Sequence, residues 1–269
     1  MALGKTDQQR ILNRYGTWAL VTGASSGLGR AVAEELAATG MNLLLVARRK
    51  GVLEEIAASY KDQHAIEAHI LSADLSQEEG LTAVLAAAET LDIGLLVTAA
   101  GFGSSGRFLD AELEEEVNML SVNCEAVLRL VHHFGNKFKV VKHGGIILFS
   151  SIVAFQGAPF SAHYAATKAY IQSLGEALAV EWKGSGVDIL VTAPGPVKTE
   201  FGGRANMNMD DAQNPNKLAI SILNALGRRT LNFPGFLTKF LTGSLSLLPR
   251  WGKVRVMKVV MSGMTKAKI

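Results

Sequence analysis

The stretch Thr17-Trp18-Ala19-Leu20-Val21-Thr22-Gly23-Ala24-Ser25-Ser26-Gly27-Leu28-Gly29 decides the fold. Residues 17–21 form a short apolar run that predicts a buried strand, and residues 30–38 are strong helix formers. The glycines between them let the backbone approach a pyrophosphate, which the free N–H groups of the helix N-terminus can bind. The alternative is a flexible turn, but a strand and a helix flank the loop. We therefore expect a dinucleotide site here.

A second apolar run, residues 41–47, predicts the next strand and ends in Arg48-Arg49-Lys50. In NAD sites, an acidic residue at the end of this strand holds the ribose hydroxyls. Here three basic residues take the place of the acidic one, and a guanidinium can bind a 2′-phosphate through two hydrogen bonds. A solvated basic turn is the alternative. The position favours NADP(H) over NAD(H).

Apolar runs and helical patterns alternate along the rest of the chain. Further strands are expected at 65–71, 93–98, 144–149, 187–193 and 230–233, and helices at 51–60, 77–89, 161–183 and within 208–226. Residues 111–140 read as long and helical, with an interruption near Gly135, and Asp74 or Ser76 could cap the helix at 77. This alternation predicts a doubly wound, mostly parallel seven-stranded sheet, a Rossmann fold, in a single domain over 1–269.

Tyr164 and Lys168 are four residues apart, so on a helix they share one face. A free phenol titrates near ~10, and a close ammonium is expected to lower that pKa. Such a pair can transfer protons near neutral pH. Its alternative is a half-buried tyrosine beside a solvated lysine.

Asn123 and Cys124 lie in an apolar helical run. A buried amide needs partners, so Asn123 makes either a structural hydrogen bond or a kink with a bound water. Cys124 has no base in its local sequence and reads as a small core residue. The six histidines lack metal-ligand spacing, and no metal site is expected.

Composition bounds the class of protein. The chain has 269 residues, of which 48% are hydrophobic and 19% charged, which suits a buried core. One cysteine excludes an internal disulfide and fits a reducing compartment. We expect neither a signal peptide nor a membrane-spanning helix, and hence a cytoplasmic protein.

Together these motifs resemble the short-chain dehydrogenase/reductase family over roughly residues 15–235. Thr22-Gly23-Ala24-Ser25-Ser26-Gly27-Leu28-Gly29 is similar to its glycine motif, and Ser151 precedes Tyr164 by a spacing common in the family. One departure is Thr98-Ala99-Ala100-Gly101, where the family usually has Asn-Asn-Ala-Gly. The lost asparagine affects local hydrogen bonding in that loop rather than the chemistry.

The resemblance implies a ketone–alcohol interconversion and assigns roles. The implied catalytic residues are Asn123, Ser151, Tyr164 and Lys168. The implied cofactor-binding residues are Gly23, Ser25, Ser26, Gly27, Leu28, Gly29, Arg48, Arg49, Asp74, Leu75, Ala100, Gly101, Tyr164, Lys168, Pro194, Gly195, Val197 and Thr199. Tyr164 would donate the proton, Ser151 would bind the carbonyl oxygen, and Asn123 would hold a water.

We expect an NADP(H)-dependent reductase of a small-molecule carbonyl or alcohol. The alternative is a catalytically silent NADP(H) sensor or scaffold. Apolar residues in 200–215, with Phe102 and Phe155 as pocket walls, indicate a lipid-like, acyl or steroid-like ketone, or simple packing. The family commonly pairs through its two long helices, so a homodimer or homotetramer is expected.

Charge is uneven along the chain, because residues 212–269 hold ten Lys or Arg and no Asp or Glu. The apolar and basic extension from about 235 to 269 predicts either a helix packed over the substrate cleft or on a second subunit, or a peripheral membrane contact. Nucleic acid is not expected, since no binding motif accompanies the charge.

Overall fold

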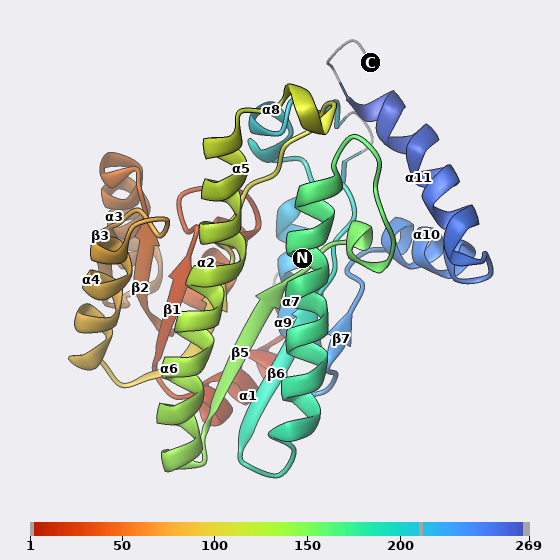
Figure 1. The fold of residues 1–269 in the computed structure, drawn as a ribbon. Coiled ribbons are helices and arrows are strands. Elements are labelled where there is room, and N and C mark those ends of the chain that lie inside the picture. Colours follow the sequence, from red (N-terminus) through yellow and green to blue (C-terminus); the bar gives the residue numbers. More distant parts are fainter. Residues whose placement is uncertain (1–2, 210–211, 266–269) are drawn as a thin grey trace.

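The computed structural model describes residues 3–209 and 212–265, apart from the side chains of Leu237 and Ser246 (Figure 1). Its strands are β1 (Trp18–Thr22), β2 (Asn42–Ala47), β3 (Ala68–Ser72), β4 (Ile93–Thr98), β5 (Gly144–Phe149), β6 (Val187–Thr192) and β7 (Leu231–Asn232). All seven form one parallel sheet in the order β3-β2-β1-β4-β5-β6-β7. The predicted doubly wound sheet is confirmed.

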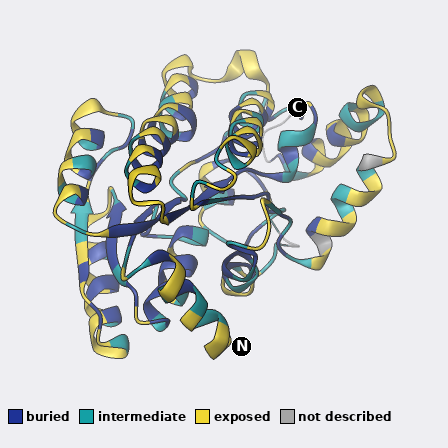
Figure 2. Ribbon diagram, turned by 90° about the horizontal axis from the view of Figure 1, so that it is seen from below, coloured by how far each residue is buried: buried dark blue, intermediate teal, exposed yellow. Residues whose placement is uncertain are grey.

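Helices cover both faces of this sheet (Figure 1). The helices are α1 (Lys5–Tyr15), α2 (Gly27–Ala38), α3 (Lys50–His64), α4 (Glu78–Glu89), α5 (Leu113–Leu120), α6 (Ala126–Val141), α7 (Ala162–Glu181), α8 (Phe201–Arg204), α9 (Pro215–Ala225), α10 (Phe236–Ser246) and α11 (Arg250–Met264). One core lies between the sheet and α1, α2, α3 and α9, and the other between the sheet and α4, α6 and α7. Figure 2 shows the buried sheet between these exposed outer layers. Two-sided burial explains why the strands read as continuous apolar runs.

Helix α1 was not expected from the sequence. It closes the sheet edge opposite the strand C-terminal ends, with Ile11 and Tyr15 fully buried. The Tyr15 hydroxyl donates to Asp188 Oδ2 (2.7 Å), which also accepts from Arg14. A Cβ at Gly94 would stand 1.9 Å from the Tyr15 carbonyl oxygen, so the helix packs directly on the backbone of β4.

Three local expectations were wrong. The helical stretch after 111 is interrupted not at Gly135 but by a π-helical turn, Ser121–Glu125. Gly135 instead makes room for a ring, since a Cβ there would lie 2.3 Å from Trp182. The third strand begins at Ala68, because Ala65 ends α3 in the left-handed conformation (φ 54°). Neither Asp74 nor Ser76 caps α4; Asp74 accepts hydrogen bonds from the Ser76 N–H and hydroxyl.

The C-terminal extension folds into two helices, which both views show at the periphery, away from the sheet (Figures 1 and 2). Thr238 of α10 is buried and accepts hydrogen bonds from the Gly195 N–H (3.1 Å) and Gln213 Nε2 (2.9 Å). The Met264 carbonyl at the end of α11 accepts from the Asn208 N–H (2.7 Å). The extension is therefore tied to the loops that follow β6. No helix within the described ranges is long and apolar enough to cross a membrane.

Candidate active site

A cavity of about 480 Å³ opens at the C-terminal ends of the strands. Its walls come from the loop between β1 and α2, the ends of β2 to β6, and helices α7, α8 and α11. In open α/β sheets this edge is where ligands bind. The cavity has two parts that differ in chemistry.

The first part is the glycine loop. Gly23 and Gly27 have positive φ values of 66° and 59°. A Cβ at Gly23 would lie 2.8 Å from the Ala99 carbonyl oxygen, and one at Gly29 would lie 2.5 Å from the Gly23 carbonyl oxygen. Only glycine fits, and the N-terminus of α2 is thereby left open toward the cavity. Free backbone N–H groups at a helix start suit the pyrophosphate of a dinucleotide.

The three basic residues after β2 have different partners in the structure. Arg48 lines the cavity, is half exposed, and has only a loose ion pair with Asp74 (3.9 Å). Arg49 also lines it but is engaged: it donates to the Ser25 carbonyl and hydroxyl and pairs with Glu200 (2.9 Å). Lys50 begins α3 and pairs with Glu54 (3.8 Å) outside the cavity. Arg48 is therefore the cation most available to a phosphate.

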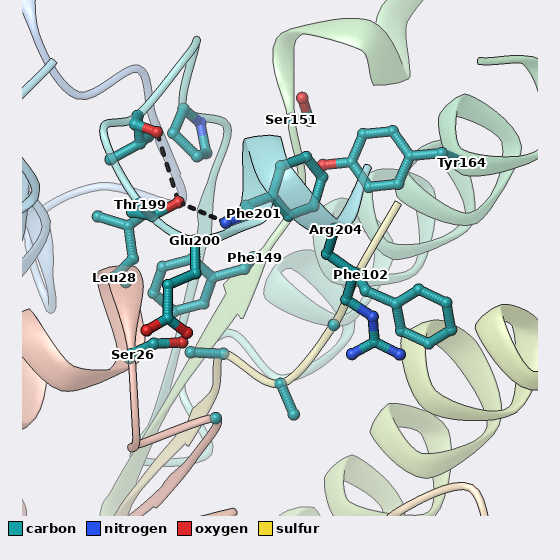
Figure 3. Close-up of a pocket in the computed structure, with 18 of the residues that line it drawn as sticks. Ser26, Leu28, Phe102, Phe149, Ser151, Tyr164, Thr199, Glu200, Phe201 and Arg204 are labelled. Atoms are coloured by element: carbon teal, nitrogen blue, oxygen red, sulfur yellow. Dashed lines mark hydrogen bonds between the residues drawn. The ribbon is translucent and has the colours of Figure 1, made fainter. Parts of the chain in front are cut away.

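Tyr164 stands where the two parts of the cavity meet. It is the third residue of α7, half-buried, with its ring 5.4 Å from the Phe201 ring. Ser151 lies at its hydroxyl end (Figure 3). The Ser151 hydroxyl accepts a long bond from the Val153 N–H (3.4 Å), which leaves its own proton directed to other acceptors such as the phenol oxygen.

The pKa of Tyr164 is not lowered as expected. Burial raises its pKa to about 12, and the hydrogen bond with Ser151 opposes only part of that. Lys168 is buried and donates to the Phe149 carbonyl (2.8 Å), with its Nζ 5.8 Å from the centre of the Tyr164 ring. Burial lowers the pKa of Lys168 to about 8. The phenol is therefore neutral at pH 7 and carries a proton.

Asn123 lies behind these residues in the π-helical turn. Its Nδ2 donates to the Phe102 carbonyl (2.8 Å) and to Thr167 Oγ1 (3.0 Å), and its Oδ1 accepts from the Phe102 N–H (3.1 Å). A Cβ at Gly101 would stand 2.9 Å from Asn123 Oδ1 and 3.5 Å from Lys168 Nζ. The turn thus fastens α7 to the loop after β4, and the structural hydrogen bond of the two sequence alternatives is present.

The second part of the cavity is apolar and rich in methionine. Its lining includes Phe102, Val153, Phe201, Met207, Met209, Leu241, Met257, Val260, Met261 and Met264. Helix α11 supplies four of these, which confirms the expected C-terminal helix over the cleft, although residues 93 to 100 positions beyond Tyr164 could not be identified individually from a local pattern. Phe155 was wrongly expected here; it packs against Phe233 (5.6 Å) outside the lining. Of the expected pocket segment 200–215, residues 210 and 211 lie outside the described residues.

Arg204 lies in the expected pocket segment 200–215, but the sequence did not single it out. Its guanidinium lies 3.7 Å from the centre of the Phe102 ring (Figure 3). Glu200, which immediately precedes α8, lies toward Ser26 (Figure 3). The short helix therefore bridges the cavity between the glycine-loop side and the Phe102 side. Burial, and after it repulsion from Arg48, lowers the pKa of Arg204.

Every implied cofactor-binding residue lies on this cavity. Of the four implied catalytic residues, Ser151, Tyr164 and Lys168 line it and Asn123 supports it from behind. Cys124 is buried and packs near the Thr167 carbonyl, and burial raises the pKa of its thiol to about 11, as suits a core residue. Within the described part of the chain, no three His, Cys, Asp or Glu residues are placed to hold a metal ion.

Comparison with protein families matches residues 17–210 to the short chain dehydrogenase model. The chain belongs to the short-chain dehydrogenase family. This short-chain dehydrogenase is accordingly an oxidoreductase that acts on CH–OH groups.

Three relatives illustrate the likeness. The 7beta-hydroxysteroid dehydrogenase of Collinsella aerofaciens is 35% identical over 189 residues, covering 70% of this chain and 72% of the relative. A solved structure of a 7beta-hydroxysteroid dehydrogenase superposes with a TM-score of 0.85 at 29% identity, covering 92% of this chain and 98% of the other. A short-chain dehydrogenase from Sphingobium yanoikuyae in complex with NADPH has a TM-score of 0.77 at 29% identity, covering 87% and 96%.

Proposed function

We propose that this short-chain dehydrogenase interconverts a bulky apolar ketone and its secondary alcohol with NADP(H), and that Tyr164 transfers the proton. One observation carries the proposal. The hydroxyl end of Tyr164, with Ser151 beside it, stands between a glycine loop open to a dinucleotide and a methionine-rich apolar pocket.

The residues present fit a proton transfer in the direction of ketone reduction. NADPH would supply a hydride to the carbonyl carbon when bound. With a pKa near 12, Tyr164 is neutral at pH 7 and can give its proton to the carbonyl oxygen, which becomes the alcohol. The Ser151 hydroxyl can donate a hydrogen bond to the same oxygen as negative charge develops there. The buried Lys168 ammonium, one helical turn away, stabilises the phenolate that remains.

The basic end of β2 supports NADP(H) over NAD(H). Arg48 offers an uncommitted guanidinium, and Asp74 and Leu75, which would frame the adenine, lie on the same part of the cavity. The NADPH complex of the relative from Sphingobium yanoikuyae adds support. In this proposal Asn123 holds the π-helical turn that positions Lys168, and it would also hold a water.

The substrate class rests on the pocket and on the relatives. A wall of methionines and phenylalanines is apolar and adaptable, which suits a large, rigid hydrocarbon frame. The likeness to 7beta-hydroxysteroid dehydrogenases supports a steroid-sized ketone over a short one.

A screen of ketones and alcohols of increasing size, with NADPH and NADH in parallel, tests the proposal. The expected result is turnover that prefers NADPH and rises from cyclohexanone to polycyclic ketones. Tight NADPH binding with no turnover of any carbonyl would instead favour the sensor or scaffold alternative and would refute the proposal.

We also propose that the protein is a homo-oligomer whose subunits pair through the side formed by α5, α6 and α7. Its proposed location is the cytoplasm. Support comes from exposed apolar residues on α5 and α6, namely Val117, Leu120 and Leu128. Introducing a charge at Leu120 is expected to dissociate the oligomer in light scattering, and an unchanged mass would refute this interface.

A further inference from the structure

The C-terminal helices α10 and α11 have two unlike sides. Their inward side is fastened to the protein through Thr238, Met257 and Met261, all buried. Their outward side carries large apolar residues, of which Phe236 is 84% exposed and Val259 is 74% exposed. An exposed apolar face on this scale is unusual in a monomer and marks an interaction surface.

The outward apolar residues follow helical spacing. Phe236 and Phe240 are four residues apart on α10, and Val256 and Val259 are three apart on α11. Val259 lies about half a turn from Met257 and Met261, so α11 is apolar on opposite sides. A helix that is apolar on both sides is normally covered on both. The inward side faces the pocket, so the outward side is left to contact another apolar environment.

The charged residues of α10 and α11 are all basic. Lys239 lies on α10, and Arg250, Lys253, Arg255 and Lys258 lie on α11. The sequence has no Asp or Glu after residue 211. The Arg255 guanidinium stands 4.9 Å from the ring of Trp251, which is itself 64% exposed. Aromatic and basic residues together are typical of the interface between lipid headgroups and acyl chains.

We propose that the outward side of α10 and α11 docks on the surface of an anionic lipid bilayer. The apolar residues would enter the boundary of the acyl region, and the cations would meet the headgroups. A second copy of this chain is the weaker occupant, because it would bring one all-cationic border against another. No helix needs to cross the bilayer for this contact.

Docking would bring the substrate pocket to the lipid. Val260, Met261 and Met264 line the cavity on the same helix that presents Val259 outward. A lipid-soluble ketone could then reach the pocket from the bilayer. This consequence rests on the proposed function, whereas the docking itself does not.

Co-flotation of the full chain with vesicles tests the docking. We expect recovery with vesicles rich in phosphatidylglycerol and little with phosphatidylcholine alone. Recovery should fall when NaCl is raised to about 1 M, where the Debye length is about 3 Å. Trp251 provides a second readout, since Trp18 and Trp182 pack against the core. Its emission should shift to the blue on adding anionic vesicles, and the Trp251→Phe variant should lose that shift.

Charge variants separate docking from general attraction. Neutralising three cations of α11 (Lys253→Gln, Arg255→Gln, Lys258→Gln) should lower partitioning on the order of 100-fold, at about fivefold per cation. The matched control removes three exposed lysines elsewhere (Lys61→Gln, Lys139→Gln, Lys183→Gln) and should change it little. Phe236→Ser with Phe240→Ser should also weaken docking. Unchanged NADPH binding and thermal unfolding verify that each variant is folded.

Absence of recovery with anionic vesicles, or equal loss in the test and control triples, would overturn the docking. The docking would also be overturned if the wild-type protein were a dimer that does not bind vesicles and sedimentation showed that Phe236→Ser with Phe240→Ser dissociates it. The face would then belong to a second copy. A failure to turn over ketones would leave flotation unaffected, so the two proposals fail separately.

Discussion

Replacing Arg48 with Gln should weaken NADPH binding far more than NADH binding. Arg48 now has only a loose, half-exposed ion pair with Asp74 at 3.9 Å, worth about 0–1 kcal/mol. Almost all of its capacity is therefore free for a 2′-phosphate. Arg49 is a poorer candidate, because Ser25 and Glu200 already occupy its guanidinium.

The magnitude follows from the hydrogen bonds that a guanidinium gives to a charged oxygen. Such bonds contribute about 1.5–3 kcal/mol. The dissociation constant of NADPH should thus rise about 10- to 150-fold in Arg48→Gln, with NADH changed by no more than about twofold. Titration of nicotinamide fluorescence with each cofactor measures both constants without requiring a substrate.

Lys50→Gln is the matched control. It removes the same charge one residue away in sequence, from a side chain that is 70% exposed and paired with Glu54. Its effect on the dissociation constant of NADPH should be small, about twofold, as for a surface charge. An equal loss of NADPH and NADH in Arg48→Gln, or equal losses in Arg48→Gln and Lys50→Gln, would refute the reasoning.

Two further predictions concern stability and the glycine loop. Burial lowers the pKa of Lys168 from 10.5 to about 8, so the unfolded chain binds more protons than the folded chain between these values and stability rises with pH there. Lys168→Met should therefore raise the free energy of unfolding at pH 7 by about 1–3 kcal/mol. Urea unfolding should show this gain over wild type shrinking toward pH 10. A gain that stays constant with pH would contradict its assignment to the buried Lys168 charge. Gly29→Ala places a Cβ 2.5 Å from the Gly23 carbonyl oxygen, so cofactor binding should be lost and the melting temperature should fall, whereas Gly40→Ala would strain only a surface turn.

Much of the cofactor side could be predicted because its signals are local. The glycine loop, the basic end of β2 and the Tyr164–Lys168 spacing each lie within a few residues of sequence. Parallel strands bring their C-terminal ends to one edge, so the alternation of strands and helices was enough to gather them. The family resemblance supplied the residue roles.

The substrate side could be predicted only in part, because it is assembled from distant segments: Phe102, the segment 200–215 and a C-terminal helix over the cleft were expected, but not which residues of that helix line the cavity. The α11 methionines reach the cavity by packing against the segments that follow β5 and β6, and the Asn208 N–H donates to the carbonyl at the end of that helix. Phe155 is apolar and close in sequence to Ser151, yet it packs on Phe233. Aromatic character alone therefore does not identify a pocket wall.

The pKa of Tyr164 also could not be predicted from the sequence. Spacing placed Lys168 one turn away, but it could not show that the Phe149 carbonyl holds the ammonium or that burial dominates both pKa values. Asn123 is similar: its place in the chain was visible, but the π-helical turn that aims its amide was not.

The most direct test of proton transfer by Tyr164 is the rate of NADPH oxidation by Tyr164→Phe with a ketone that the wild-type protein reduces. Removing a general acid should lower the rate by about 10²- to 10⁴-fold. The dissociation constant of NADPH should stay within about threefold, because the phenol hydroxyl stands at the junction with the substrate pocket, away from the phosphate-binding loop. A variant that binds NADPH and still reduces the ketone at nearly the wild-type rate would contradict the account.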